Sequence, residues 1–317
     1  MTGKYTIRVK NNRVRFELTV ERNITILRGD SATGKTTLLN LLRAYEEYGK
    51  NSGVSVDSPK PCVVLSGPYW EAILERVRDS IVFIDENSAF VASPDFAKAV
   101  QKYDNYYVIV TRENLPQIPY SVSSILKLRK TTSRKKLTYN KAYPLYNQIL
   151  NAKVVLNTSA LYLTEDSRSG YELFSAIAVQ NNAVCQSTYG NAGVLKLLQS
   201  LERQKTLIIA DGAAFGPYIN GVFEWIKHRN HFILYLPESL EWLILRSSIL
   251  RDPEIQGILD NPQDYIDSSR HFSWEQFFTE LLIRKTADTY MSYQKSHLNP
   301  FYLQSENIDK IISTIEK

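Results

Sequence analysis

The sequence predicts an α/β protein with two domains, each built around a parallel sheet covered by helices. A strand, a glycine-containing loop and a helix follow one another over residues 23–45. Strand and helix patterns alternate again from about residue 160, where four short apolar segments are separated by helical ones. With 317 residues the chain exceeds the usual size of one domain, so we expect domains at residues 1–150 and 151–317.

The first domain opens with a predicted β-hairpin. Apolar and charged residues alternate over residues 4–10 and 13–20, and Asn11 and Asn12 supply the turn between them. Residues 23–27 follow as a strand. The helix after the loop has an apolar face and is expected to end near Gly49, and its face consists of Leu38, Leu39, Leu41, Leu42 and Tyr45.

The loop between this strand and helix fits the phosphate-binding P-loop pattern, in which a glycine, four residues and Gly-Lys-Thr follow one another. It consists of Gly29, Asp30, Ser31, Ala32, Thr33, Gly34, Lys35 and Thr36, with Thr37 next in the chain. Glycines let consecutive N–H groups point at a phosphate, Lys35 supplies a positive charge to the terminal phosphates, and Thr36 offers a hydroxyl to Mg²⁺. We therefore expect these nine residues to bind ATP with Mg²⁺.

Two further strands of this domain end in polar residues. Residues 81–84 are fully apolar, as in the middle of a parallel sheet, and Asp85 and Glu86 follow them. We expect Asp85 to hold Mg²⁺, and Glu86, with Lys35, to act in catalysis by polarising the attacking water. The alternative is an ordinary buried strand that ends at two solvated acids. Residues 106–110 end at Thr111, which either senses the γ-phosphate or places its hydroxyl in a turn.

These features resemble P-loop ATPases. The hairpin ahead of the loop resembles the start of ABC-type ATPases, and residues 81–86 resemble a Walker B element. No convincing ABC signature or glutamine loop is present, so the subgroup stays open. A basic cluster, Arg129–Lys130 and Arg134–Lys136, is either a solvated hairpin or a contact to a phosphate backbone.

The predicted strands of the second half also end in polar residues. Glu165 follows residues 160–163, a Gly190-Asn191 turn follows residues 183–185, Asp211 follows residues 206–210, and Glu238 follows residues 231–236. Ligands of such sheets bind beyond the carboxyl ends of the strands. We therefore expect these residues to converge.

This order resembles the Toprim domain of topoisomerases, primases and OLD-family nucleases, and a P-loop ATPase followed by Toprim resembles the OLD-family layout. The resemblance implies that Glu165 and Asp211 are catalytic and bind Mg²⁺. The chain departs from the family where Asp-x-Asp is expected, because it has Ala213 at the second aspartate. Two-metal phosphodiester chemistry needs clustered carboxylates. The acids that can compensate are Asp166, Glu172, Glu238 and Glu241.

Three functions follow as hypotheses. The first is an ATPase whose nucleotide state controls a Toprim-like domain that acts on DNA or RNA, and the resemblance implies phage defence or DNA maintenance. The second is an ATP-dependent switch whose degenerate second domain binds a protein or nucleotide partner without cutting. The third is a small-molecule kinase, which the missing arginine-rich lid and the unexplained second domain disfavour.

Composition sets the remaining expectations. No apolar run approaches the ~18 residues of a membrane helix, so we expect no membrane partner. Cys62 and Cys185 lie far apart, without metal-ligand or disulfide spacing, which favours a reducing cytoplasm. The net charge of +5 is compatible with nucleic acid without demanding it. We expect either a homo-oligomer or a complex with a partner protein.

Overall fold

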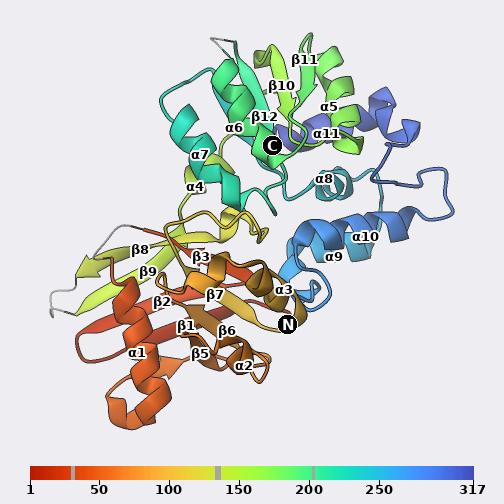
Figure 1. Ribbon diagram of the computed structural model, residues 1–317. Helices are drawn as coiled ribbons and strands as arrows, with labels where there is room; N and C mark the ends of the chain where they lie inside the picture. The colour runs from red at the N-terminus through yellow and green to blue at the C-terminus, as the bar shows by residue number, and fades with distance from the viewer. Residues whose placement is uncertain (30–32, 133–136, 202–203) are drawn as a thin grey trace. The chain divides into compact units, whose positions relative to one another are not determined.

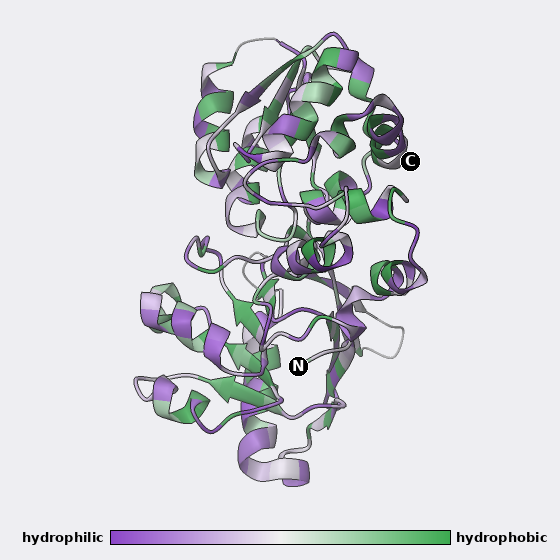
Figure 2. Cartoon of the chain, turned by 90° about the vertical axis from the view of Figure 1, so that its right-hand side faces the viewer, coloured by the Kyte–Doolittle hydropathy of each residue, from purple (hydrophilic) through white to green (hydrophobic). Residues whose placement is uncertain are grey.

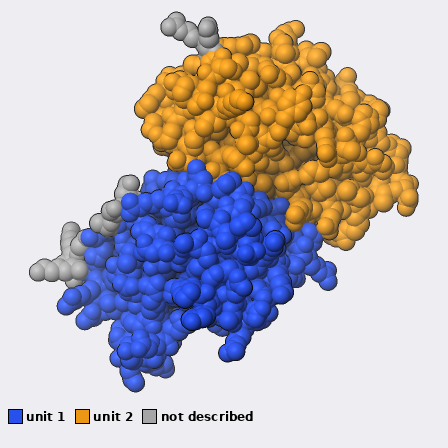
Figure 3. All heavy atoms as spheres, viewed as in Figure 1, with its two compact units in different colours: residues 1–146, 261–273 blue, residues 147–260, 274–317 orange. Residues whose placement is uncertain are grey.

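The computed structural model describes residues 1–29, 33–132, 137–201 and 204–317 (Figure 1). Within these residues the predicted α/β class is confirmed, with one nine-stranded mixed sheet and one four-stranded parallel sheet. The chain divides into two compact units, which Figure 3 distinguishes by colour. Unit 1 consists of residues 1–146 and 261–273, and unit 2 of residues 147–260 and 274–317.

Unit 1 contains the nine-stranded sheet, in the order β4-β1-β2-β9-β8-β3-β7-β6-β5. Its strands are β1 Tyr5–Lys10, β2 Val14–Val20, β3 Ile24–Leu27, β4 Ser55–Asp57, β5 Cys62–Leu65, β6 Ile81–Ile84, β7 Tyr106–Val110, β8 Ile125–Thr132 and β9 Thr138–Pro144. Its α-helices are α1 Lys35–Tyr48, α2 Trp70–Leu74 and α3 Pro94–Lys102.

The predicted opening hairpin is confirmed, because β1 and β2 pair antiparallel. The side chain of Asn11 fixes its turn by accepting hydrogen bonds from the N–H groups of Arg13 and Val14, both at 2.9 Å. The basic segment also forms a hairpin, β8–β9, which joins the same sheet because β9 pairs with β2. Of its basic cluster, Arg134, Lys135 and Lys136 lie outside the described residues.

The other half of this sheet is parallel. Strand β3 pairs with β7, β7 with β6, and β6 with β5, while β8 flanks β3 on the opposite side. After β3 the chain forms β4 at one edge of the sheet and β5 at the other, and the later strands β7 and β8 take the two places beside β3. A strand where the order reverses in this way has a ligand crevice beyond its carboxyl end.

Alternation along β7 assigns the two faces of the sheet. Tyr106 and Val108 face a core shared with Leu38 and Leu42 of α1. On the opposite face, Tyr107 packs edge-on against Phe96 of α3. Apolar residues drawn green mark these central strands in Figure 2. Burial of both faces explains why β6 and β7 have no exposed residue.

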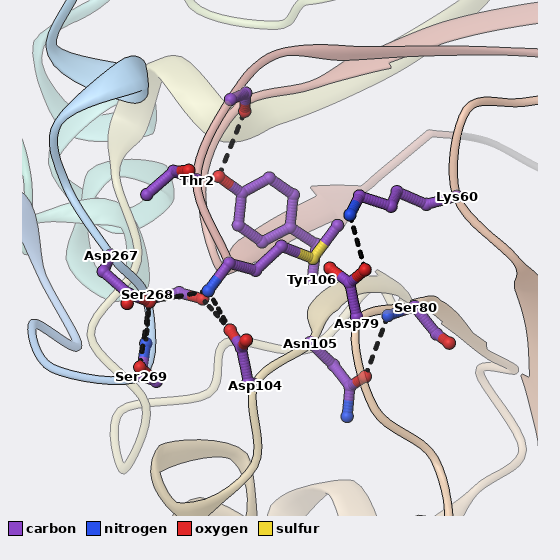
Figure 4. A network of polar contacts seen from close by, with 12 residues as sticks. Thr2, Lys60, Asp79, Ser80, Asp104, Asn105, Tyr106, Asp267, Ser268 and Ser269 are labelled. Carbon is purple, nitrogen blue, oxygen red and sulfur yellow. Dashed lines mark hydrogen bonds and ion pairs between the residues drawn. The ribbon is translucent and has the colours of Figure 1, made fainter.

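Residues 261–273 belong to unit 1, although the sequence placed them in the second domain. The ammonium group of Met1 pairs with Asp104 and, at 2.6 Å, with Asp267 (Figure 4). The N–H of Gly3 donates to the carbonyl of Gln263 at 2.6 Å. The amide of Asn23, next to β3, donates to the carbonyl of Phe272. No local pattern encodes these contacts with the segment 261–273, because the partners lie 249–266 residues apart in the chain.

Unit 2 contains the parallel sheet β11-β10-β12-β13, and the predicted alternation is confirmed. Its strands are β10 Leu161–Thr164, β11 Val184–Ser187, β12 Thr206–Ile209 and β13 Phe232–Tyr235. Its α-helices are α4 Asn147–Leu150, α5 Ser169–Gln180, α6 Asn191–Ser200, α7 Gly216–Ile226, α8 Leu240–Arg246, α9 Pro253–Asp260, α10 Trp274–Thr286 and α11 Ser305–Ile315.

Helices cover both faces of the unit 2 sheet. Helix α5 contacts β10 and β11 and packs against α11, while α6 packs against α7. Figure 1 shows these two pairs on opposite sides of the strands. Helix α8 contacts α10 and α11. Among the described residues, no helix combines the length and the apolar character that crossing a membrane requires.

Candidate functional site

The predicted phosphate-binding loop lies between β3 and α1. Asp30, Ser31 and Ala32 of the prediction lie outside the described residues. Lys35 is 5% exposed, and its ammonium group donates to the carbonyl oxygen of Gly29 at 2.6 Å and to the hydroxyl of Thr33 at 3.2 Å. Its charge is therefore held within the loop, at the carboxyl end of β3.

The start of α1 is left with its positive dipole end uncompensated. Gly34 is the N-cap with φ of 94°, no side chain caps the helix, and its first turn holds no acid. A Cβ at position 34 would also lie 3.1 Å from Cε1 of Phe16, so both conformation and space require glycine. Thr36 and Thr37 are exposed in the first turn. Such a helix start favours a bound anion.

Asp85, Glu86 and Thr111 line one cavity of about 410 Å³ at the carboxyl ends of β6 and β7. Asp85 pairs with Arg43 of α1 at 3.1 Å, and Glu86 pairs with Arg112 at 3.5 Å. The Thr111 hydroxyl accepts a hydrogen bond from the Glu113 N–H at 3.0 Å, which is the turn role named as its alternative. Lys35 and Thr36 lie at the end of the strand next to β7.

In unit 2, Glu165 and Asp211 line a cavity of about 230 Å³. Backbone contacts fix both at neighbouring strand ends. The N–H of Glu165 donates to the carbonyl of Ile209 at 3.0 Å, and the N–H of Gly212 donates to that of Pro237 at 2.6 Å. A Cβ at Gly212 would lie 3.0 Å from two carbonyl oxygens, so only glycine allows this approach after Asp211.

Helix α8 adds a third carboxylate, Glu241, which is 1% exposed and lines the same cavity. Its Oε1 accepts a hydrogen bond from the hydroxyl of Tyr293 at 2.8 Å. That hydroxyl also lies 3.1 Å from the hydroxyl of Ser169. Oε2 of Glu241 has no hydrogen-bond partner among the described residues. A buried carboxylate oxygen without a donor is costly, so this site is suited to a cationic ligand.

The sequence analysis missed two residues of this cavity, Glu275 and Lys295. Glu275 lies in the first turn of α10, and its carboxylate pairs with the ammonium group of Lys295. Lys295 lies in a tight turn whose flanking residues, Gln294 and His297, form an isolated bridge. In the sequence Glu275 is an ordinary acid near the start of a helix, and only spatial proximity identifies it as part of the cavity.

Burial and neighbouring charges raise the pKa of two acids in this cavity, Glu165 and Asp211. Burial, with the charges of Glu275 and Asp166, raises the pKa of Glu165 to about 7. Burial and the nearby charges of Glu275, Glu165 and Glu241 raise the pKa of Asp211 well above its usual value. Burial opposes the charge of Lys295, but Glu275 and its neighbours outweigh it and raise the pKa of Lys295. The cavity thus holds more carboxyl groups than the one ammonium group of Lys295 can neutralise when they ionise.

The other proposed compensating acids have different contacts. Both carboxylate oxygens of Asp166 accept backbone N–H groups at the start of α5. Glu172 binds the ring of His297 at 2.7 Å and the N–H of Leu298 at 2.6 Å. Glu238 lines a separate cavity. Ala213 is 3% exposed and is not part of the cavity lining. Asp166 and Glu241 both line the cavity, and of these two only Glu241 has a buried carboxylate oxygen without a donor among the described residues.

The donor set of the cavity consists of oxygens, the ligands that Mg²⁺ and Mn²⁺ prefer. The orphaned oxygen of Glu241 agrees with such an ion. However, within the described part of the chain no three His, Cys, Asp or Glu side chains are grouped closely enough to hold a metal. Glu275 is turned to Lys295, and Glu241 to Tyr293. The cavity therefore offers oxygen atoms that suit a cation, but among the described residues no three of these side chains surround a common point.

Comparisons of the chain with protein-family models, with curated proteins and with solved structures found no match. The likeness to P-loop ATPases and to Toprim domains therefore depends on the motifs, the strand order and the two cavities described above.

Proposed function

We propose that this protein is an ATP-binding and hydrolysing P-loop protein whose nucleotide state controls a Toprim-like cation site that acts on nucleic acid. Cofactors would be ATP and Mg²⁺. The observation that carries the nucleotide part is the strand order β3-β7-β6, which brings Lys35, Thr111 and Asp85 to one edge of the sheet. A charge for phosphate, a hydroxyl and a carboxylate for Mg²⁺ are the groups that phosphoryl transfer to water uses.

The arginine pairs of unit 1 also agree with a nucleotide site. Asp85 and Glu86 each pair with an arginine across distances of 3.1 and 3.5 Å, so neither acid requires a metal for neutralisation. In the proposed mechanism, Asp85, once released from Arg43, would help to hold Mg²⁺, and Glu86 would accept a proton from the attacking water. The exposed hydroxyl of Thr36 lies in the first turn of α1, where it is free to turn towards the ion.

The cavity of unit 2 supports a phosphodiester as the ligand rather than a whole nucleotide. Its volume of about 230 Å³ lies below the ~300–1,000 Å³ of small-molecule pockets but accommodates an ion with a phosphate group. A divalent ion there would polarise the phosphoryl oxygen and activate water. Glu165, Asp211 and Glu241 are the residues that would hold it.

The chain itself offers a route for control of unit 2 by unit 1. Residues 261–273 are bound within unit 1, where Phe272 accepts a hydrogen bond from Asn23 beside β3. Three residues later the same chain supplies Glu275 to the cavity. A movement of β3 on nucleotide binding would therefore reach Glu275 through a short covalent path.

Loss of Lys35 tests the nucleotide part. Lys35→Ala should abolish detectable ATP binding in isothermal titration, because the ammonium group contacts the terminal phosphates. Lys50→Ala removes an exposed lysine just after α1 and should bind ATP as the parent does. Unchanged affinity in Lys35→Ala would contradict the proposed site.

Cleavage separates the leading function from the non-cutting switch. Single-stranded DNA and RNA are incubated with the full chain, ATP and Mn²⁺, alongside a Glu165→Ala, Asp211→Ala double variant. The leading function requires that only the parent cuts. The ion pair of Lys295 and the alanine at position 213 favour the non-cutting switch. In that case neither the parent nor the double variant cuts, while binding of a partner still depends on ATP. Equal cutting by both would reject the cavity as the site.

A further inference from the structure

The carboxylate cavity of unit 2 already contains one cationic group, the ammonium of Lys295. It shares the cavity with five carboxylates, those of Glu165, Asp166, Asp211, Glu241 and Glu275. We infer that Lys295 is the resident cation of this cavity and that a divalent ion binds there only in competition with it. This inference rests on the cation-site part of the proposed function and adds the feature that regulates that site.

The position of Lys295 is fixed by its neighbours in the chain rather than by its own ion pair. On one side, Tyr293 is 2% exposed and its hydroxyl binds Glu241. On the other, Glu172 of α5 binds the ring of His297 and the N–H of Leu298. These contacts anchor the turn at both ends and so hold the lysine at the cavity.

The ammonium group itself can leave. The side chain of Lys295 is 47% exposed and that of Glu275 is 21% exposed. Ion pairs this accessible to water contribute at most about 1 kcal/mol, so a bound ion can replace the lysine at Glu275 at little cost. The anchored backbone keeps Lys295 at the mouth, ready to return when the ion leaves.

The ion pair of Lys295 also explains why the carboxylates of this cavity are not grouped around one point. No three candidate ligands in the described residues are grouped to hold a metal, although five carboxylates line one cavity. While Lys295 binds Glu275, that carboxylate is directed to an ammonium group rather than to a common ion. Release of Lys295 would free Glu275, and the orphaned Oε2 of Glu241 would supply a further oxygen.

The test measures Mn²⁺ binding by the full chain without nucleotide, by titration calorimetry. The Asp211→Asn variant defines which part of the binding belongs to the cavity. Lys295→Met should raise the Mn²⁺ affinity of the cavity by up to about fivefold, because a competing positive charge is removed. Lys295→Arg keeps the charge and should bind as the parent does.

Lys310→Met is the matched control, because it deletes the Lys310–Glu306 pair on α11 outside the cavity and should leave Mn²⁺ affinity unchanged. Should the methionine variant fail to fold, Lys295→Gln repeats the test. If the parent binds Mn²⁺ in the cavity and Lys295→Met binds it with equal or lower affinity, the proposed competition is wrong, while the cation site itself stands. No binding at Asp211 in either protein would instead reject the cation site and, with it, this inference.

Discussion

The acids at the strand ends of the two units are neutralised in different ways. In unit 1, Asp85 and Glu86 each have an arginine, Arg43 and Arg112. In unit 2, five carboxylates share one cavity with a single lysine. Unit 1 thus presents a charge-balanced edge, whereas unit 2 presents one that is short of positive charge. The difference indicates that the second site depends more strongly on a cation from solution.

The largest expected effect concerns Glu86, at the charge-balanced strand ends of unit 1. Glu86→Gln should leave ATP bound while slowing its hydrolysis by about 10²–10⁴-fold, because an amide cannot accept the proton of the attacking water. Phosphate release under saturating ATP measures this change. As a control, Glu113→Gln alters an acid close to Thr111 and should hydrolyse ATP at the parent rate. A Glu86→Gln protein with full turnover would remove the catalytic role from the balanced edge.

A smaller effect is expected from the unbalanced cavity. Tyr293→Phe removes the donor to Oε1 of Glu241, whose Oε2 already has no partner among the described residues. A buried carboxylate stripped of its donor should lower the free energy of unfolding by about 1–3 kcal/mol. Urea unfolding followed by tryptophan fluorescence suits this test, because Trp225, Trp242 and Trp274 of the four tryptophans belong to unit 2.

Tyr290→Phe provides the comparison for that variant. Tyr290 is 76% exposed, so loss of its hydroxyl should change the unfolding free energy by less than about 0.5 kcal/mol. Equal stability of the two phenylalanine variants would mean that Glu241 is solvated or protonated, and that unit 2 is not short of cations.

The remaining effects are on pH dependence, and they have opposite signs in the two units. The pKa of Glu165 rises to about 7, above the unfolded value of about 4.3. Its contribution to stability is therefore complete below pH ~4.3 and is lost as the pH rises towards 7. Glu165→Gln should remove this decline, measured as the urea midpoint of unit 2 between pH 4.5 and 8.

In unit 1, Asp267 behaves in the opposite way. Burial tends to raise its pKa, but hydrogen bonds from the Met1 ammonium and from Ser269 outweigh burial and hold it at about 2. Its contribution is present above the unfolded value of about 3.9 and is lost as the pH falls through 2. Asp267→Asn should flatten this acid response, measured by exchange protection of β3 amides. The same pH response in both units would contradict the difference in charge balance.

Sequence patterns predicted those parts of the sites that lie at strand ends. Glu165 and Asp211 could be expected to approach each other because parallel strands present their carboxyl ends at one edge. Glu275 and Lys295 could not, because they reach the cavity from a helix and a turn outside the sheet, without characteristic spacing. The α/β class and the opening hairpin follow from alternation, whereas the pairing of β9 with β2 is a long-range register.

The segment 261–273 also constrains the order in which the protein can fold during synthesis. Strands β1–β9 leave the ribosome first, yet unit 1 receives its last piece only after residues 147–260 of unit 2 have been made. Until then, the Met1 ammonium lacks Asp267 and Asn23 lacks the carbonyl of Phe272. Unit 1 therefore stays incomplete during synthesis until residues 261–273 have been made. A fragment of residues 1–150 would lack the contacts with residues 261–273 permanently.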